Sequence, residues 1–377
     1  MPAPWKKFST PSPSIYDIEE LKKEIGTRFP FYDMKTTRKA LLFYCNVDKE
    51  NLETNFGTLR KSLSELGYIP LLRYEGGEHI IYVIKKPERK EKPVILNIIL
   101  LIATIITTIL TGSLLNMGYG DLQSLPNIIE VFSPVNLFWG TVLFSLPLMS
   151  ILFIHEMGHY LISKRHDLHT SLPFFIPIPP ILPGFNIGTF GALISSNDPM
   201  PDKKALFDVG ISGPIAGFLV ALPVTIIGIV TSQVISMDAV PPGEIALGSS
   251  LLFSLLSQAI LNLPANTALD LNPIAFAGWI GMLITSINLL PAGQLDGGHI
   301  FRAVFGAKQK FAGWIAVFIM IITGWWFFAF IIIMLIGMEH PPPLNDDTEL
   351  DMKRKLLFFI ALAILILCYI PFPISYL

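Results

Sequence analysis

The chain has 377 residues, of which 52% are hydrophobic and only 15% are charged. This composition is typical of a protein that crosses a membrane several times, and not of a soluble domain. With 27 lysines and arginines against 29 aspartates and glutamates, the chain has no basic excess with which to bind nucleic acid. Its two cysteines, Cys45 and Cys368, lie near opposite ends of the sequence, which disfavours both a disulfide and a cysteine metal site.

Residues 1–92 have the polar composition and the periodicity of a small soluble domain. The pattern predicts helices and strands in a β-α-β-β order after a first helix. The helices are expected over 15–25 and 49–66, and the strands over 40–47, 68–74 and 79–85. Because this α/β domain carries no catalytic constellation, we expect a binding or regulatory function for it. A charged linker, 85–92, leads from the domain to the membrane.

Six apolar runs follow the linker, and each is near or above the roughly 20 residues that a helix needs to cross a bilayer. They are 93–115, 136–163, 205–231, 273–291, 311–337 and 355–372. The predicted fold class is therefore a polytopic α-helical membrane protein with about six transmembrane helices and a small N-terminal soluble α/β domain.

The loops between the apolar runs carry a consistent charge bias. Lysines and arginines occur in 85–92, 164–204 and 302–310, whereas 116–135 and 232–272 contain neither. The positive-inside rule places the lysine-bearing segments in the cytoplasm. We therefore expect a multi-pass protein of the cell membrane with a cytoplasmic N-terminal domain.

One charged cluster conflicts with this topology. Lys353, Arg354 and Lys355 would lie outside the cell if 311–337 crosses the membrane once. Gly324 could divide that run into a re-entrant pair, but about 13 residues per leg are too few to cross twice. We therefore keep six crossings.

The most informative motif lies at the end of the second apolar run. His155-Glu156-Met157-Gly158-His159 places two histidines at i and i+4, on one face of a helix, where both can bind one zinc ion. Glu156 can accept a proton from an attacking water molecule. Ionisable groups in an apolar segment cost roughly 2.5–3.5 kcal/mol each on insertion scales, so catalysis is the favoured explanation. The alternative is a polar helix end at the membrane interface.

Two stretches do not fit simple crossings. Residues 171–198 are rich in proline and glycine, and 186–194 within them is predicted to form a short strand or hairpin that dips toward the membrane. Residues 249–261 are apolar and are predicted to form a helix at the outer interface.

A catalytic zinc ion needs a third protein ligand and one open position. The segment 288–299 follows the fourth run, contains one proline and three glycines, and is predicted to lie on the same side of the membrane as His155. Asp296 in this segment would complete a set of two histidines and one carboxylate. An ordinary Asp-Gly turn is the alternative. His299 is a competing ligand, for which a supporting structural position is favoured.

The remaining histidines fit the site less well. His166 and His169 follow the motif too closely to complete the same zinc site easily, and we predict an interfacial position for both. His79 and His340 have no evident partner in the sequence.

The combination of His155–His159 with Asn-x-x-Pro-x-x-x-Leu-Asp-Gly at 288–297 resembles the site-2 proteases. These are intramembrane zinc metalloproteases that cut transmembrane helices of other proteins. The motifs match without a mismatch, and their order covers roughly 93–310. Residues 212–217 and 185–194 look like the Gly-Pro element and the membrane-inserted hairpin of the family. The chain lacks an obvious PDZ or cystathionine-synthase-like module, and its N-terminal α/β domain and the segment 338–343 look more like those of archaeal and plant-plastid members.

The resemblance implies His155, His159 and Asp296 as ligands of one catalytic zinc ion, and Glu156 as the general base. It also suggests that the amide of Asn288 donates to the developing oxyanion. Polar packing between helices is the alternative for Asn288.

The resemblance further implies a zinc metalloprotease core over 93–310 and C-terminal transmembrane helices over 311–377. The predicted function is hydrolysis of peptide bonds in transmembrane helices of membrane-bound substrates, with the active site toward the cytoplasmic side. Another membrane zincin would usually take its third ligand from a glutamate, and the apolar runs between 205 and 337 contain none. A non-enzymatic metal-binding or transport protein would space ionisable residues along several helices.

Overall fold

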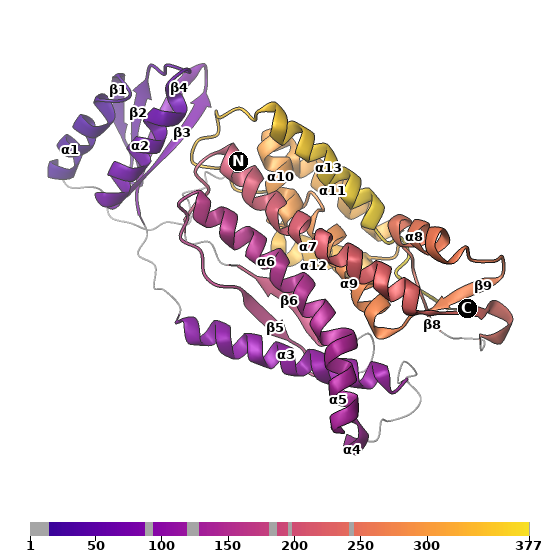
Figure 1. The fold of residues 1–377 in the computed structure, drawn as a ribbon. Coiled ribbons are helices and arrows are strands. Elements are labelled where there is room, and N and C mark those ends of the chain that lie inside the picture. Colours follow the sequence, from indigo (N-terminus) through magenta and orange to yellow (C-terminus); the bar gives the residue numbers. More distant parts are fainter. Residues whose placement is uncertain are drawn as a thin grey trace.

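The computed structural model describes residues 15–86, 93–118, 128–180, 187–194, 198–240 and 245–376 (Figure 1). Within these ranges, four helical segments are long and apolar enough to cross a membrane. They are Val94–Asn116, Pro134–Arg165, Lys203–Thr231 and Asp296–Ile322. These helices and the small N-terminal sheet agree with the predicted class, while the count of about six crossings is not confirmed.

The N-terminal unit is a four-stranded antiparallel sheet with two helices, in the strand order β1-β2-β4-β3. Its elements are α1 (Ile15–Gly26), β1 (Phe31–Thr36), β2 (Leu41–Cys45), α2 (Leu52–Glu65), β3 (Tyr68–Glu75) and β4 (Glu78–Lys85). The predicted helices and strands are present. Strand β1 was not predicted, because it is a mostly exposed edge strand whose sequence shows no regular alternation of apolar and polar residues. The core forms where Phe43 of the sheet meets Phe56, Leu59 and Leu63 of α2.

Helix α7 (Lys203–Thr231) lies at the centre of the helical bundle and contacts α6 (Leu146–Arg165), α9 (Pro273–Asn288) and α10 (Asp296–Phe305) (Figure 1). Small residues let these helices approach closely. A Cβ on Gly228 of α7, for example, would lie 2.3 Å from the Cα of Ala275 on α9. The helices that carry the two sequence motifs are therefore held against one common neighbour.

A short β-hairpin lies between α3 (Val94–Asn116) and α6 (Figure 1). It consists of β5 (Phe174–Pro177) and β6 (Thr189–Leu193). The Asn97 side chain of α3 donates to the carbonyl oxygens of Leu172 and Pro173, and Thr107 donates to Gly188 O. The strand predicted over 186–194 is thus present. Its partner β5 was not predicted, because the surrounding sequence is rich in proline.

The prediction that 311–337 crosses the membrane once was wrong. The run forms α11 (Gln309–Ile322), then α12 (Trp326–Ile331) and a π-helical turn η5 (Ile332–Ile336), and it folds back on itself at Gly324, whose φ is +86°. The backbone N–H of His340 donates to Gln309 Oε1, so the two ends of this helical hairpin meet. Each leg packs on the rest of the bundle, so neither leg has to be long enough to cross a bilayer alone.

This helical hairpin removes the charge conflict at the start of α13 (Met352–Cys368). Arg354 binds Asp208 of α7 through two hydrogen bonds of 2.7 and 2.6 Å. The same Asp208 carboxylate lies 3.0 Å from Nε2 of His166, directly after α6. The basic cluster 353–355 therefore lies at the same end of the bundle as the basic end of α6.

The opposite end of the bundle carries short elements. Residues 245–247 pair with the C-terminal strand 374–376, and residues 233–236 pair with 267–270 in a second two-stranded sheet, directly before α9. The helix predicted over 249–261 is present. The remaining short elements of the fold are α4 (Ile128–Val131), α5 (Pro134–Gly140), η2 (Thr141–Ser145), β7 (Gln233–Ser236), η3 (Met237–Ala239), β8 (Ile245–Leu247), α8 (Leu251–Leu261), β9 (Thr267–Asp270) and β10 (Ile374–Tyr376). A 3₁₀ turn, η4 (Gly306–Lys308), joins α10 to α11.

Candidate metal centre

Helix α6 presents His155 and His159 one turn apart toward α7, and both are buried. Glycines on the facing side of α7 make room for the two imidazole rings. A Cβ on Gly213 would lie 2.1 Å from Nε2 of His159, and a Cβ on Gly217 would lie 3.0 Å from Nδ1 of His155. The sequence motif at 212–217 suggested only close helix packing, whereas the structure shows that its glycines accommodate the histidines themselves.

Asp296 begins α10 after a break in the helical path at 289–295. Pro291 lies in this break, and Gly293 has a φ of +46°, a conformation that glycine adopts without strain. The loop folds back on the first turn of α10, where a Cβ on Gly297 would lie 2.0 Å from the carbonyl oxygen of Leu289. This compact turn brings the Asp296 carboxylate to α6.

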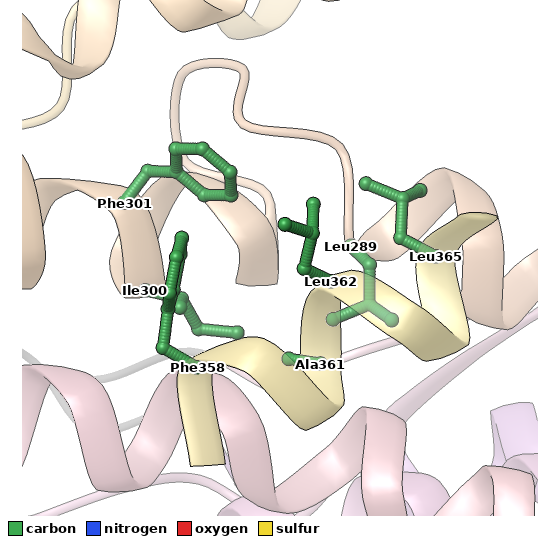
Figure 2. Close-up of a pocket in the computed structure, with 7 residues that line it drawn as sticks. All are labelled: Leu289, Ile300, Phe301, Phe358, Ala361, Leu362 and Leu365. Carbon is green, nitrogen blue, oxygen red and sulfur yellow. The ribbon is translucent and has the colours of Figure 1, made fainter. Parts of the chain in front are cut away.

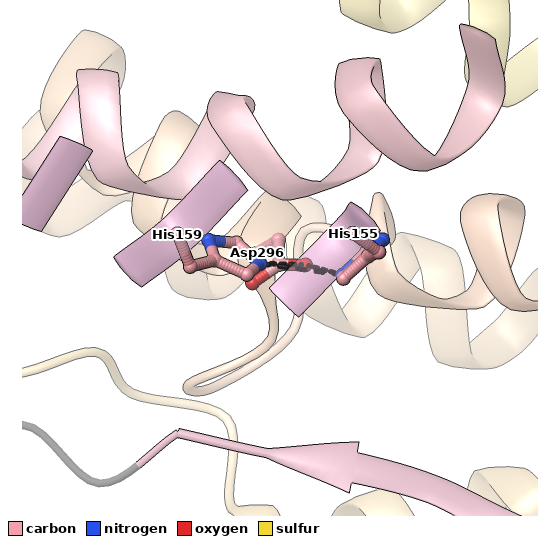
Figure 3. A group of neighbouring side chains, drawn as sticks. All are labelled: His155, His159 and Asp296. Carbon is pink, nitrogen blue, oxygen red and sulfur yellow. Dashed lines mark hydrogen bonds and ion pairs between the residues drawn. The ribbon is translucent and has the colours of Figure 1, made fainter. Parts of the chain in front are cut away.

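The three side chains converge on one point (Figure 3). Nε2 of His159 lies 3.2 Å from Nε2 of His155 and 3.2 Å from Oδ2 of Asp296, and the third side of this triangle is 3.3 Å. Nδ1 of His159 lies 2.8 Å from the carbonyl oxygen of Val209. Because a carbonyl can only accept, this Nδ1 carries the hydrogen, and the lone pair on Nε2 faces the other two groups.

This donor set fits a metal ion. Two imidazole nitrogens and a carboxylate oxygen at such distances repel one another unless a proton or a metal ion lies between them. Ligand atoms about 2.0–2.1 Å from a tetrahedral zinc ion lie about 3.3 Å apart, which is the spacing of the triangle. The hydrogen bond from His159 to Val209 O also has the form that orients a metal-binding histidine.

Glu156 adjoins the triangle on α6. Its side chain is buried, with 6% of the residue exposed, and it is close enough to interact electrostatically with His155, His159 and Asp296. No lysine or arginine forms an ion pair with it within the described ranges. A carboxylate held in this way is available for proton transfer and is not committed to a structural ion pair.

Asn288, the last residue of α9, also reaches the centre, because its Nδ2 lies 3.3 Å from Nε2 of His155. His299 does not join the triangle. Its Nδ1 donates to the carbonyl oxygen of Leu295, and its ring packs against His340 at 4.4 Å between centroids. The structure therefore gives His299 the supporting position that the sequence favoured.

The other histidines have acidic or polar partners away from the triangle. His166 pairs with Asp208, and His169 lies 2.7 Å from Oδ2 of Asp198. The expectation that His79 has no partner was wrong, because its Nε2 lies 3.1 Å from Oδ2 of Asp347. That partner is 268 residues away in the sequence, so periodicity could not reveal it.

A separate crevice lies between α10 and α13 (Figure 2). It has no room for a water molecule, and its described lining is wholly apolar, so it can neither bind a metal ion nor supply a catalytic group. The lining residues are Leu289, Ile300, Phe301, Phe358, Ala361, Leu362 and Leu365.

The family comparison covers all the elements that form the triangle. A family model described as peptidase family M50 matches residues 143–332, just over half of the chain. The chain belongs to peptidase family M50. The match includes α6, α7, α9 and α10. The resemblance to site-2 proteases, which was inferred from the two sequence motifs, is therefore confirmed.

Similar proteins occur in plants. The M50 chain is 28% identical over 341 residues to the probable zinc metalloprotease EGY1, chloroplastic, of Arabidopsis thaliana, a match that covers 84% of the chain and 56% of the relative. It is 30% identical over 238 residues to the protein of the same description from Oryza sativa subsp. japonica, covering 59% of the chain and 39% of the relative. The chain thus spans about half the length, or less, of these curated relatives. No solved structure matches the chain.

Proposed function

We propose that this chain is an intramembrane zinc endopeptidase that hydrolyses peptide bonds in transmembrane segments of membrane-bound substrates. The triangle of His155 Nε2, His159 Nε2 and Asp296 Oδ2, with the buried Glu156 carboxyl beside it, carries the proposal. Membership of family M50 and the description of the plant relatives as zinc metalloproteases support it. In this proposal 93–310 form the catalytic core, 1–92 a binding or regulatory domain and 311–377 the C-terminal membrane helices.

His155, His159 and Asp296 would hold one zinc ion. Bound zinc supplies a Lewis acid that polarises the scissile carbonyl and acidifies the attacking water. The Val209 carbonyl fixes the ring of His159 so that its Nε2 faces the site.

Glu156 is the proposed general base. Its carboxylate takes a proton from the attacking water and passes it to the nitrogen of the leaving amine. Asn288 is proposed to donate its amide hydrogen to the oxyanion that develops on the substrate carbonyl, because its Nδ2 borders the same centre. The burial of both histidines and of Glu156 keeps bulk solvent away from these charges.

The hairpin β5–β6 is the proposed substrate platform. Strand β6 pairs with β5, and no other strand pairs with it in the part of the chain that the structure describes. Phe190 and Leu193 of β6 are 76% and 63% exposed. An extended substrate segment can add to such a free edge as a further strand. The substrate helix must unwind first, which proline, glycine or asparagine near the cut would favour.

We further propose a multi-pass protein of the cell membrane, with the N-terminal domain and the active site toward the cytoplasmic side. The lysine bias of the loops supports this orientation. The names of the plant relatives place those proteins in chloroplasts. Membrane fractionation of cells that express the chain distinguishes a position in the cell membrane from one in a chloroplast membrane.

The decisive experiment compares the wild type with Glu156→Gln on co-expressed single-span substrates, followed by membrane proteomics. We expect the variant to bind zinc as the wild type does, because Glu156 is not a ligand, and to lose cleavage. Cleavage by the variant at the wild-type rate would contradict the proposed mechanism. Zinc binding without cleavage by the wild type would instead favour a non-enzymatic metal-binding protein.

A further inference from the structure

Residues 338–351 connect η5 to α13, and we call this segment the strap. It has no regular secondary structure, yet it contacts the N-terminal domain and the helix that begins with Asp296. In Figure 1 this connection runs from the helical bundle toward the N-terminal sheet. Segments about 270 residues apart in the sequence thus meet at one place.

At one side the strap extends the N-terminal sheet. The backbone N–H of Leu72 on β3 donates to the carbonyl oxygen of Leu344 at 2.8 Å, and Arg73 Nη1 donates to the same oxygen at 2.9 Å. The Leu344 side chain is only 4% exposed and belongs to the core of the N-terminal domain. His79 of β4 also pairs with Asp347 of the strap at 3.1 Å. Through these contacts the strap covers the outer edge of β3 and holds the N-terminal domain in place.

At the other side the strap holds α10. Oδ2 of Asp346 lies 2.6 Å from Nη2 of Arg302, whose side chain is only 7% exposed. The ring of His340 packs against His299, three residues after Asp296. Asp346 and Asp347 are consecutive, so one residue binds α10 while the next binds the N-terminal domain.

The strap also supports the loop that precedes Asp296. Gln309 accepts a hydrogen bond from the backbone of His340 and donates to the carbonyl oxygen of Pro291 at 2.6 Å. Gly337 lies directly before the strap and close to Gly293. A Cβ on Gly293 would lie 2.2 Å from the carbonyl oxygen of Gly337. Asp296 is therefore flanked on both sides by segments that the strap positions.

Asp346 is the charge on which this arrangement depends. Lys203 lies 4.0 Å from its carboxylate, and the charge of Arg73 interacts with it as well. Arg73 is 8% exposed, and its Nη2 is buried without a hydrogen-bond partner among the residues that the structure describes. Loss of the Asp346 charge would leave three cations close together and Arg302 buried without its ion pair, which is strongly unfavourable.

We propose that the docked N-terminal domain acts through the strap as a positioning element for Asp296, with Asp346 as the positioning residue. The inference rests on the zinc site of the proposed function and adds a mechanism of regulation to it. Release of the domain from the strap frees α10 and weakens metal binding. A partner that binds the β3 edge in place of the strap would therefore lower activity.

The test measures zinc affinity of the full-length chain in detergent, by competition with a chromophoric chelator, together with amide hydrogen exchange. Asp346→Asn removes the charge that holds α10, and Leu344→Ala removes the anchor in the N-terminal core. Glu349→Gln is the matched control, because Glu349 is an exposed acidic residue of the same strap. We expect both test variants to bind zinc more weakly by about 5- to 150-fold, the usual range of coupling between sites, with the control unchanged.

Hydrogen exchange separates coupling from a local effect. In Leu344→Ala we expect faster exchange in 68–75, where the domain undocks, and also in 289–305, where Asp296 is held. Unchanged zinc affinity in both variants, or unchanged exchange in 68–75, would overturn the inference and leave the proposed function standing. Absence of zinc binding by the wild type would refute the proposed function and, with it, this inference.

Discussion

Replacement of Gly213 by alanine tests the geometry of the metal centre most directly. The new Cβ would lie 2.1 Å from Nε2 and 2.5 Å from Cδ2 of His159. Non-bonded heavy atoms normally approach to about 3.5–4.0 Å. The imidazole ring therefore has to move by more than about 1 Å, or α7 has to separate from α6. Either change also strains the hydrogen bond between Nδ1 of His159 and Val209 O.

The size of this displacement sets the expected effect. Metal sites tolerate deviations of about 0.2 Å in ligand position, and a misplacement of about 1 Å at a catalytic centre costs about 100-fold in rate. We expect Gly213→Ala to lower both zinc affinity and cleavage by at least about 100-fold, which corresponds to about 2.8 kcal/mol. An added methyl group in a packed interface should also cost about 1–3 kcal/mol of stability.

Gly228→Ala controls for that general cost. Gly228 lies on the same helix α7, and its Cβ would lie 2.3 Å from the Cα of Ala275, away from the metal centre. We expect this variant to lose stability but to bind zinc like the wild type. The assay is zinc stoichiometry and competition in detergent, beside thermal unfolding of each variant. Zinc affinity of Gly213→Ala within about threefold of the wild type, or equal losses in both variants, would refute the reasoning.

Two further predictions concern the rest of the chain. Gly324→Ala should destabilise the protein by about 1–2 kcal/mol without changing zinc affinity, because φ is +86° and the nearest atom to a new Cβ is 3.6 Å away; an unaltered thermal midpoint would contradict this. Burial raises the pKa of the Cys45 thiol to about 12, so iodoacetamide should leave it unmodified at pH 8 until denaturant is added, as peptide mass spectrometry can show. Because an unfolded thiol ionises near pH 8.5 and the folded one does not, the N-terminal domain should also lose stability as the pH rises through that value.

The sequence alone was informative where structure depends on local spacing. The i, i+4 arrangement of His155 and His159 determines their common face as soon as the segment is helical. The break at 289–295 could be predicted from Pro291 and Gly293, because proline lacks the backbone N–H of a regular helix and glycine adopts a positive φ without strain. The apolar runs and the charge bias of the loops likewise predicted the membrane class, because hydrocarbon excludes charge over lengths of about 20 residues.

Tertiary structure decided the features that depend on partners distant in the sequence. The edge strand β1 and the strand β5, which lies in a proline-rich segment, have weak local signals and exist because β2 and β6 pair with them. The run 311–337 is apolar enough to cross once, but packing turns it back at Gly324. Hydropathy measures the affinity of a segment for an apolar environment and does not show whether lipid or protein provides it.

The metal centre combines both kinds of information. The sequence by itself determined which side chains can bind a metal ion, because donor chemistry and helical spacing are local properties of His155, His159 and Asp296. Only the tertiary structure decided that Gly213 and Gly217 give the rings their space and that the strap ties Asp296 to the N-terminal sheet. Those contacts join residues tens to hundreds of positions apart, and their energies depend on distances that exist only in the folded chain.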